Sequence, residues 1–460
     1  MKRRILMCLA VFSMFCLASS GINAAVGDFA LIHDFAGGND DGSNQYSQRL
    51  ITDGAKLYAI TEQGGDNNLG TIYSMNMDGG GFTLLHDFAS GQTDGGYPTG
   101  SLLHSAGKLY GTAVYGGRFG NWGVIFSMNT DGSGFTLIHE FAGFPADGAL
   151  PVASLLLYSG KLCGLTNAGG SIGRGTAFSM NTDGSASALI HEFAGGVDDG
   201  SYPYGSLVLS GSKFFGMTRW GGDNDKGVIF SMNPDGSGFT LLHEFAGGSN
   251  DGAEPFGTPI VSGGKLYGMT NLGGDNDKGV IFSMNMDGSG FTLLHEFAGG
   301  SNDGSFPLGD LAIYDSKLYG MTGQGGDNNF GVLFSIKTDG TEFSLLKELS
   351  GPDGRTPNFE APLISGGFLY GATYRGGSND RGVVFKYELP APAPQPPVVP
   401  HCFAQIKSPP KLIQPRGRFP RLMKRQATSC KKSSSEVKSF TSFVSFLVAS
   451  TGKIELKFDN

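Results

Sequence analysis

Short runs of alternating hydrophobic and polar residues fill the chain from about residue 29 to residue 389, and they come in sets of four. One set consists of the runs 258–262, 265–270, 279–285 and 291–297. Runs of this length, bounded by Gly, Asp and Ser, predict β-strands. Gly263 and Gly264 join the first two runs, and the turn 286–290 joins the last two, which predicts two hairpins. Each set therefore predicts one four-stranded antiparallel sheet.

The set recurs seven times with a period of about 52 residues. A Gly-Gly pair begins at positions 64, 116, 169, 221, 273, 325 and 376. Four-stranded sheets repeated in tandem predict a β-propeller. The seventh set supplies only three runs before Pro390, whereas an extra run of the fourth type lies at 29–35. We therefore predict an all-β, seven-bladed β-propeller of four-stranded blades, in which the N-terminal strand completes the last blade and removes an exposed edge.

The two ends of the chain differ from the repeats. Residues 1–25 combine a basic start, an apolar run and small residues near Ala24, which predicts a secretory signal peptide. The propeller is expected to span 26–389. Residues 390–400 form a Pro-rich linker, because proline cannot donate hydrogen bonds to a sheet. Residues 401–460 are basic and Ser-rich, and we expect this tail to be mostly disordered.

Charge separates the body from the tail. Residues 5–389 contain 18 Lys and Arg against 38 Asp and Glu, whereas residues 390–460 contain 12 against 3. An acidic body argues against nucleic acid as a partner, because phosphate binding depends on cationic side chains. The apolar stretch near 440–449 is too short to span a bilayer, so no spanning segment is expected after signal removal. We expect a secreted or cell-surface monomer.

The repeat also resembles a known family. The motif LeuLeuHisGluPheAlaGlyGly, followed by LysLeuTyrGlyMetThr, Gly-Gly and GlyValIlePheSerMetAsn, resembles the GloVer (Gloeobacter/Verrucomicrobia-type) tandem repeat of secreted choice-of-anchor proteins. This resemblance covers all seven sets and implies an exported protein with a variable C-terminal anchoring signal. Residues 390–460 contain neither a Pro-Glu-Pro sorting signal nor a Leu-Pro-x-Thr-Gly motif, which departs from that pattern. Similarity to kelch and YWTD propellers concerns the fold alone.

Two loops of each blade are expected on one face, because successive strands run antiparallel. The residues just before each Gly-Gly pair differ most between repeats, and the two tryptophans belong to the same loops. Aromatic rings beside amides and Arg suit the recognition of a sugar or a peptide. The candidate ligand-binding residues are Glu62, Gln63, Tyr115, Trp122, Asn167, Arg219, Trp220, Asn271, Gln324, Tyr374 and Arg375. Drift on a solvated loop would produce the same divergence.

The loops of this face are also acidic. Asp223, Asp225, Asp275 and Asp277 are oxygen donors of the kind that Ca²⁺ takes, although Asp residues also cap turns through their own side chains. No cofactor is otherwise expected. A histidine recurs at 33, 86, 139, 191, 243 and 295, with Lys347 in the seventh place. These positions lie on separate outer strands, so we expect packing between blades rather than a shared metal ion.

Three functions remain open. The leading hypothesis is a non-enzymatic propeller that binds glycan or protein through its acidic, aromatic-bearing face. A glycan-active enzyme is the alternative, because Glu62, Glu254 and Glu360 are carboxylates that do not repeat between the sets. Glu62 and Glu360 would then act as the acid/base pair of a glycosidase, since the first and seventh blades are neighbours. A purely structural envelope protein is the third possibility.

Overall fold

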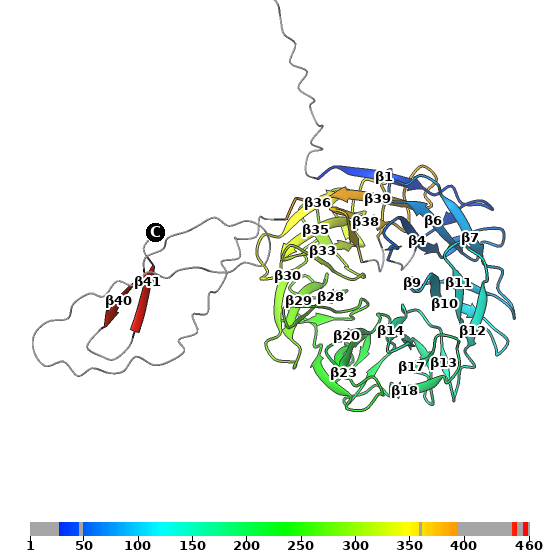
Figure 1. Cartoon of the computed structure of the whole chain (residues 1–460), viewed down its shortest axis with the longest axis horizontal. Helices are drawn as coiled ribbons and strands as arrows, with labels where there is room; N and C mark the ends of the chain where they lie inside the picture. The colour runs from blue at the N-terminus through cyan, green and yellow to red at the C-terminus, as the bar shows by residue number, and fades with distance from the viewer. Residues whose placement is uncertain (1–26, 46–48, 358–360, 393–443, 449–453, 459–460) are drawn as a thin grey trace, which may run out of the picture. The chain divides into compact units, whose positions relative to one another are not determined.

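A computed structural model describes residues 27–45, 49–357, 361–392, 444–448 and 454–458. The predicted signal peptide at 1–25 lies outside these residues, as does most of the linker and tail. Within the described residues the chain forms no helix, and seven blades are arranged around a central axis (Figure 1). Each blade has four main strands, and one short extra strand joins the sheet of the second blade. We number the blades from 1, which contains β4, to 7, which contains β38. The predicted seven-bladed propeller is confirmed.

Each blade runs from an inner to an outer strand. The inner strands are β3 (Ile51–Thr52), β9 (Leu103–Ser105), β14 (Leu156–Tyr158), β20 (Val208–Ser210), β26 (Ile260–Ser262), β32 (Ala312–Tyr314) and β37 (Leu363–Ser365). The second strands are β4 (Lys56–Thr61), β10 (Lys108–Gly116), β15 (Lys161–Thr166), β21 (Lys213–Thr218), β27 (Lys265–Thr270), β33 (Lys317–Thr322) and β38 (Phe368–Ala372). The third strands are β6 (Thr71–Asn76), β11 (Val124–Asn129), β17 (Thr176–Asn181), β23 (Val228–Met232), β29 (Val280–Asn285), β35 (Val332–Lys337) and β39 (Val383–Glu388). The outer strands are β7 (Thr83–Asp87), β12 (Thr136–Glu140), β18 (Ala188–Glu192), β24 (Thr240–Glu244), β30 (Thr292–Glu296), β36 (Ser344–Glu348) and β1 (Phe29–Asp34).

The strand β1 closes the ring as predicted. It pairs antiparallel with β39, with Phe29 opposite Tyr387 and Asp34 opposite Val383, and it lies beside β39 in Figure 1. Blade 7 therefore joins the start of the repeats to their end. This arrangement satisfies the outer edge of β39, which would otherwise be exposed.

Short ladders tie two loops of the same blade together on one face. The loop that enters a blade pairs with the residues that follow its second strand. These ladders are β2 (Gly42–Ser43) with β5 (Gln63–Gly64), β13 (Gly148–Ala149) with β16 (Ala168–Gly169), β19 (Gly200–Ser201) with β22 (Trp220–Gly221), β25 (Gly252–Ala253) with β28 (Leu272–Gly273), and β31 (Gly304–Ser305) with β34 (Gln324–Gly325). In blade 2, β8 (Gly95–Pro98) pairs with β10 directly. We call this side the loop face; the turns between first and second strands lie on the opposite face.

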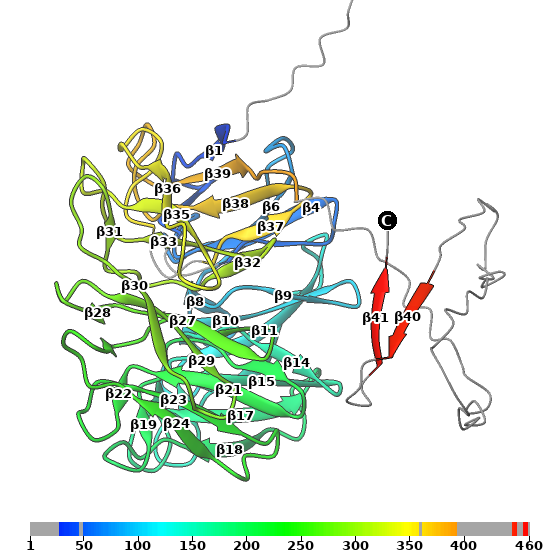
Figure 2. The same ribbon diagram turned by 90° about the vertical axis from the view of Figure 1, so that its left-hand side faces the viewer.

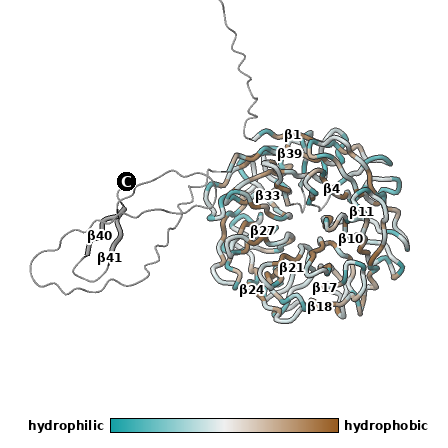
Figure 3. Tube along the Cα trace, viewed as in Figure 1, coloured by the Kyte–Doolittle hydropathy of each residue, from teal (hydrophilic) through white to brown (hydrophobic). Residues whose placement is uncertain are grey.

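The core lies between neighbouring blades. Clusters of fully buried Phe, Leu, Ile and Met combine residues from adjacent sheets, for example Phe245 of blade 4 with Phe282 of blade 5. Apolar segments follow the strands of the tube in Figure 3, while polar segments gather in the outer loops. A glycine in the second strand faces an aromatic ring of the third strand, and a Cβ added to Gly216 would lie 2.6 Å from Cζ of Phe230. These strands therefore approach too closely for a side chain at this position.

The repeated histidines support packing between blades, as expected. His243 Nε2 donates a hydrogen bond to Asp251 at 3.0 Å, and its ring stacks on Phe291 of blade 5 at 3.8 Å. The same carboxylate accepts the N–H of Ala246 and of Gly252. The carboxylate therefore fixes the loop entering blade 5, while the imidazole packs against that blade. In the seventh position Lys347 pairs with Asp353 and lies over Phe29.

A second compact unit covers Ala393–Asn460. Its described residues form one hairpin, in which β40 (Val444–Val448) pairs antiparallel with β41 (Ile454–Phe458). The rest of the tail lies outside the described residues, so its expected disorder stays a prediction. Figure 2 gives a second view of the sheets of the propeller. The described residues contain no helix with the length and hydropathy needed to cross a bilayer.

Candidate functional site

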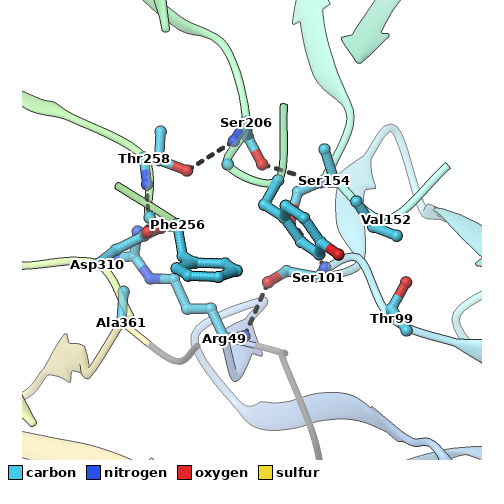
Figure 4. A pocket seen from close by; sticks show the side chains of 14 residues that line it. Arg49, Thr99, Ser101, Val152, Ser154, Ser206, Phe256, Thr258, Asp310 and Ala361 are labelled. Carbon is cyan, nitrogen blue, oxygen red and sulfur yellow. Dashed lines mark hydrogen bonds between the residues drawn. The ribbon is translucent and has the colours of Figure 1, made fainter. Parts of the chain in front are cut away.

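A hollow on the propeller axis opens at the loop face. All seven blades contribute to its lining, which places it on the axis (Figure 4). The residues that precede the inner strands form a chain of hydrogen bonds from blade to blade. Each backbone N–H donates to the hydroxyl or carboxylate oxygen of the next blade. These bonds join Arg49 to Ser101, Ser101 to Ser154, Ser154 to Ser206, Ser206 to Thr258, and Thr258 to Asp310.

Two charged residues interrupt this series of hydroxyls. Arg49 of blade 1 extends toward Asp310 of blade 6, past Ala361 of blade 7 (Figure 4). Burial raises the pKa of Asp310 to about 6, although the N–H of Thr258 and the charge of Arg49 oppose that change. Arg49 also lines the hollow, and burial lowers the pKa of its guanidinium, although the charge of Asp310 opposes that change. The floor of the site therefore presents one guanidinium, one carboxylate and several hydroxyls.

A cluster of aromatic rings and charges stands where blades 4 and 5 meet the hollow. Two rings, Tyr204 and Phe256, line it with centroids 5.0 Å apart. The guanidinium carbon of Arg219 lies 4.6 Å from the Phe256 centroid and 4.8 Å from that of Trp220. Arg219 Nη2 and Nε donate to Glu254 Oε2 at 2.9 and 3.2 Å. Because Glu254 is buried and holds the guanidinium, the cluster is preorganised.

A ring of seven left-handed residues surrounds this site. One residue in each entering loop has a φ between 53° and 57°, and none of them is glycine. Its N–H donates to a carbonyl of the preceding blade, as from Tyr202 to Arg174. In six of the seven blades its C=O accepts an N–H from its own blade, as from Arg219 to Tyr202. We call these residues the mouth ring: Asn44, Tyr97, Leu150, Tyr202, Glu254, Phe306 and Thr356.

The predicted ligand-binding residues occupy two kinds of position. Those directly before the short ladders, namely Glu62, Asn167, Arg219, Asn271 and Tyr374, donate their N–H to the carbonyl of a mouth-ring residue. Those one position later lie in the ladders or their equivalents, namely Gln63, Tyr115, Trp220, Gln324 and Arg375. The loop face therefore brings both kinds beside the mouth ring.

Their side chains do not all meet at one place. Arg219 and Trp220 join the cluster between blades 4 and 5. Arg375 lies over the Tyr374 ring and contacts Asp380 at 3.5 Å, which is a separate pair in blade 7. Tyr115 is 40% exposed and packs edge to face with Tyr97 of the mouth ring.

The other predicted residues have local roles. Asn167 Nδ2 donates to the carbonyl of Pro203 at 3.4 Å. Trp122 packs edge to face against Phe144, with centroids 5.7 Å apart, in the loops of blade 2. Its ring partner Phe144 does not line the hollow, whereas the Arg219 guanidinium lies over Phe256, which does. We therefore assign Trp122 to packing between loops rather than to the central site.

The acidic loops bind their own backbone. Asp225 Oδ1 accepts the N–H of Gly221, and Asp277 Oδ1 accepts that of Gly273, both at 2.9 Å. The N–H groups of Asp223 and Asp275 donate to glutamates of the outer strands. Among the described residues, no three His, Cys, Asp or Glu side chains are grouped closely enough to hold a metal ion. The described contacts of these loops are those of turn capping.

Of the predicted acid/base pair, the structure describes Glu62 but not Glu360. Burial raises the pKa of Glu62 to about 7. Glu360 lies outside the described residues, so its separation from Glu62 stays a prediction. Glu254, the third unrepeated carboxylate, is committed to Arg219.

Several residues of the site were not singled out from the sequence. Arg49 and Asp310 stand where four repeats carry Ser or Thr, so comparing the repeats at that position would have identified both. Tyr204 and Phe256 are likewise aromatic where other repeats carry Thr99 or Val152. The mouth ring had no such signal, because neither Tyr nor Phe favours a positive φ.

These features define a β-propeller with an open, preorganised hollow on its axis. The chain belongs to the Gloeobacter/Verrucomicrobia repeat family, whose model matches residues 21–178 and 153–385. The resemblance drawn from the repeat motif is thus confirmed. No curated protein matches the chain.

Solved structures are similar to the chain at low identity. An oligogalacturonate lyase in complex with manganese is 13% identical, with a TM-score of 0.46, over 80% of this chain and 98% of that one. A puromycin-hydrolyzing peptidase of Mycobacterium tuberculosis is 12% identical, with a TM-score of 0.47, over 75% of this chain and 52% of that one. At these values neither similarity assigns an activity to the chain.

Proposed function

We propose that this protein is a secreted, non-enzymatic propeller that binds a glycan at the hollow on its loop face. The observation that carries the proposal is the cluster of Arg219, Glu254, Tyr204, Phe256 and Trp220 at the rim. Sugar rings offer apolar C–H faces and hydroxyl groups together. Aromatic rings match the faces, and a fixed guanidinium and carboxylate match the hydroxyls.

The floor of the hollow supports the same chemistry. Ser101, Ser154 and Ser206 each accept one N–H through Oγ, which leaves the hydroxyl proton to be donated elsewhere. Arg49 and Asp310 add a donor and an acceptor beneath the rim. A polyhydroxylated ligand satisfies such groups in several directions, which an apolar ligand cannot do.

The proposal that the protein is exported rests on the sequence of residues 1–25. Lys2, Arg3 and Arg4 precede an apolar run of signal-peptide length. A glycan-binding propeller outside the cell would meet polysaccharides of the envelope or of the surroundings. Cell-surface or extracellular localisation is therefore part of the proposal, and a fusion of residues 1–25 to a reporter enzyme tests it by export.

Binding by variants of the cluster tests the glycan site. Residues 26–392 are titrated with a fixed panel of laminarin, xyloglucan, xylan and polygalacturonate by calorimetry. We expect at least one saturable interaction, which Arg219→Gln and Trp220→Ala each weaken at least 10-fold. Lys213→Ala, in the same blade but on the opposite face, is the matched control and should bind as the parent does. Failure of the parent to bind any of the four would overturn the glycan assignment and favour a structural role.

A glycan-active enzyme is a second candidate, favoured by Glu62. A carboxyl with a pKa near 7 is half protonated at neutral pH, as a general acid must be. Release of reducing ends from the bound polysaccharide distinguishes the two functions. Turnover that Glu62→Gln abolishes while binding persists would establish the enzyme, and unchanged polysaccharide after prolonged incubation supports the binding protein.

A further inference from the structure

The seven mouth-ring residues share one backbone conformation, but their side chains differ from blade to blade. Hydrogen bonds explain its backbone conformation. Each N–H bonds to the preceding blade, and in six blades the C=O bonds to a second loop of its own blade. Glycine would make the same bonds without steric cost, because it adopts positive φ freely. The chain uses glycine at dozens of other positive-φ positions. The large side chains retained at five of the seven mouth-ring positions therefore need another explanation.

Other turns show what the chain does when only the backbone matters. The left-handed position before the third strand carries Asn68, Asn121, Asp225 or Asp277, which tolerate this conformation and cap the turn. The left-handed positions of the opposite-face turns carry glycine or mostly small residues such as Ala106 and Ser159, and Glu342 is the largest side chain among the described ones. In the mouth ring, by contrast, bulky side chains occupy a conformation that costs about 1 to 2 kcal/mol for an L-residue. Strain of this kind concentrates at functional sites.

Three mouth-ring side chains contact candidate ligand-binding residues of the loop face. Glu254 holds Arg219 at 2.9 Å. Tyr97 packs against the exposed Tyr115, with ring centroids 5.7 Å apart. Asn44 Nδ2 donates to the carbonyl of Tyr374 at 3.3 Å. Tyr202 is 38% exposed on the loop face, one step along the backbone bonds from Arg219. The ring thus joins the candidate residues of several blades.

We propose that the mouth ring is the specificity-determining surface of the propeller, in which blade-to-blade hydrogen bonds fix the backbone and the side chains select the glycan. The inference rests on the proposed function. Tyr97, Tyr202 and Phe306 provide faces for sugar rings around the mouth. Glu254 sets the position of the guanidinium. Because the seven side chains differ, the surface is asymmetric although the scaffold is repeated, and it recognises one extended ligand in one orientation.

Glycine substitution separates this role from a structural one. Tyr202→Gly and Phe306→Gly keep the backbone bonds and remove the side chains, and Tyr202→Asn retains a residue tolerant of positive φ. Ser159→Gly is the matched control, because its φ is 48° and it lies in a turn on the opposite face. Each variant of residues 26–392 is measured for its melting temperature and for its affinity toward laminarin, xyloglucan, xylan and polygalacturonate.

We expect all four variants to melt no lower than about 3 °C below the parent, because relief of strain offsets lost side-chain contacts. Tyr202→Gly, Phe306→Gly and Tyr202→Asn should lose at least 10-fold in affinity or shift preference within the panel, while Ser159→Gly should not. Parent-like affinity and preference in the folded glycine variants would overturn this inference and leave the glycan site standing. A glycine variant that melts well below this limit would also overturn it, because the side chain would then be structural.

Discussion

The closure of blade 7 by the N-terminal strand can be tested by comparing two buried phenylalanines. Phe35 follows β1, and its ring packs edge to face with Tyr73 of blade 1 at 5.6 Å. Phe245 occupies the same position after the outer strand of blade 4, and its ring meets Phe282 of blade 5 at 5.6 Å. Both side chains are fully buried. Besides the partner ring, the two positions differ in that Phe35 follows a strand remote in sequence from the rest of its blade.

We expect Phe35→Ala and Phe245→Ala to cost the same free energy of unfolding, about 3 to 5 kcal/mol each, because each removes a fully buried ring. Guanidinium unfolding of residues 26–392, followed by circular dichroism, measures both under one protocol. The comparison requires that the free energy of unfolding of both variants falls with guanidinium concentration at the same slope. A cost below about 1 kcal/mol for Phe35→Ala, beside the full cost for Phe245→Ala, would refute the closure.

Two further predictions concern one buried carboxyl and one close approach of strands. Burial raises the pKa of Glu62 above its unfolded value, so the folded state holds the extra proton and stability falls as pH rises from about 4.5 to 7. Glu62→Gln should remove this fall. Between pH 5 and pH 7.5 the melting temperature of the variant should therefore rise relative to that of the parent. The same change of melting temperature in both proteins would contradict the raised pKa. Gly216→Ala should lower stability by about 1 to 3 kcal/mol, because the new Cβ meets the Phe230 ring at 2.6 Å. An unchanged denaturation midpoint for that variant would show that the two strands can separate.

Much of the scaffold follows from the sequence because the repeats reveal it. The orphan run at 29–35 and the three-stranded last set require the closure now seen between β1 and β39. The repeated histidines predicted packing between blades, and His243 stacks on Phe291 of the next blade. The two-residue ladders were not predicted, because strands as short as Gly42–Ser43 leave no hydrophobic pattern.

The site was predicted less completely, for physical reasons. Divergence before the diglycines selected Arg219 and Trp220 as candidates, and the scarcity of tryptophan selected Trp122, whose ring contacts Phe144. Ring packing in three dimensions decides between these roles, and the sequence does not contain it. The positive φ of Tyr202 was equally hidden, because the proline that follows favours an extended conformation for the residue before it.

Protection mapping of the propeller with its tightest-binding polysaccharide tests the glycan site most directly. Hydrogen exchange, read by mass spectrometry, is compared with and without the ligand for residues 26–392. The account predicts protection in the loops around Tyr202, Arg219 and Glu254, with no change in the turns of the opposite face around Ser159. Protection confined to the opposite face, or to the outer loops around Phe144, would contradict a glycan site at the central hollow.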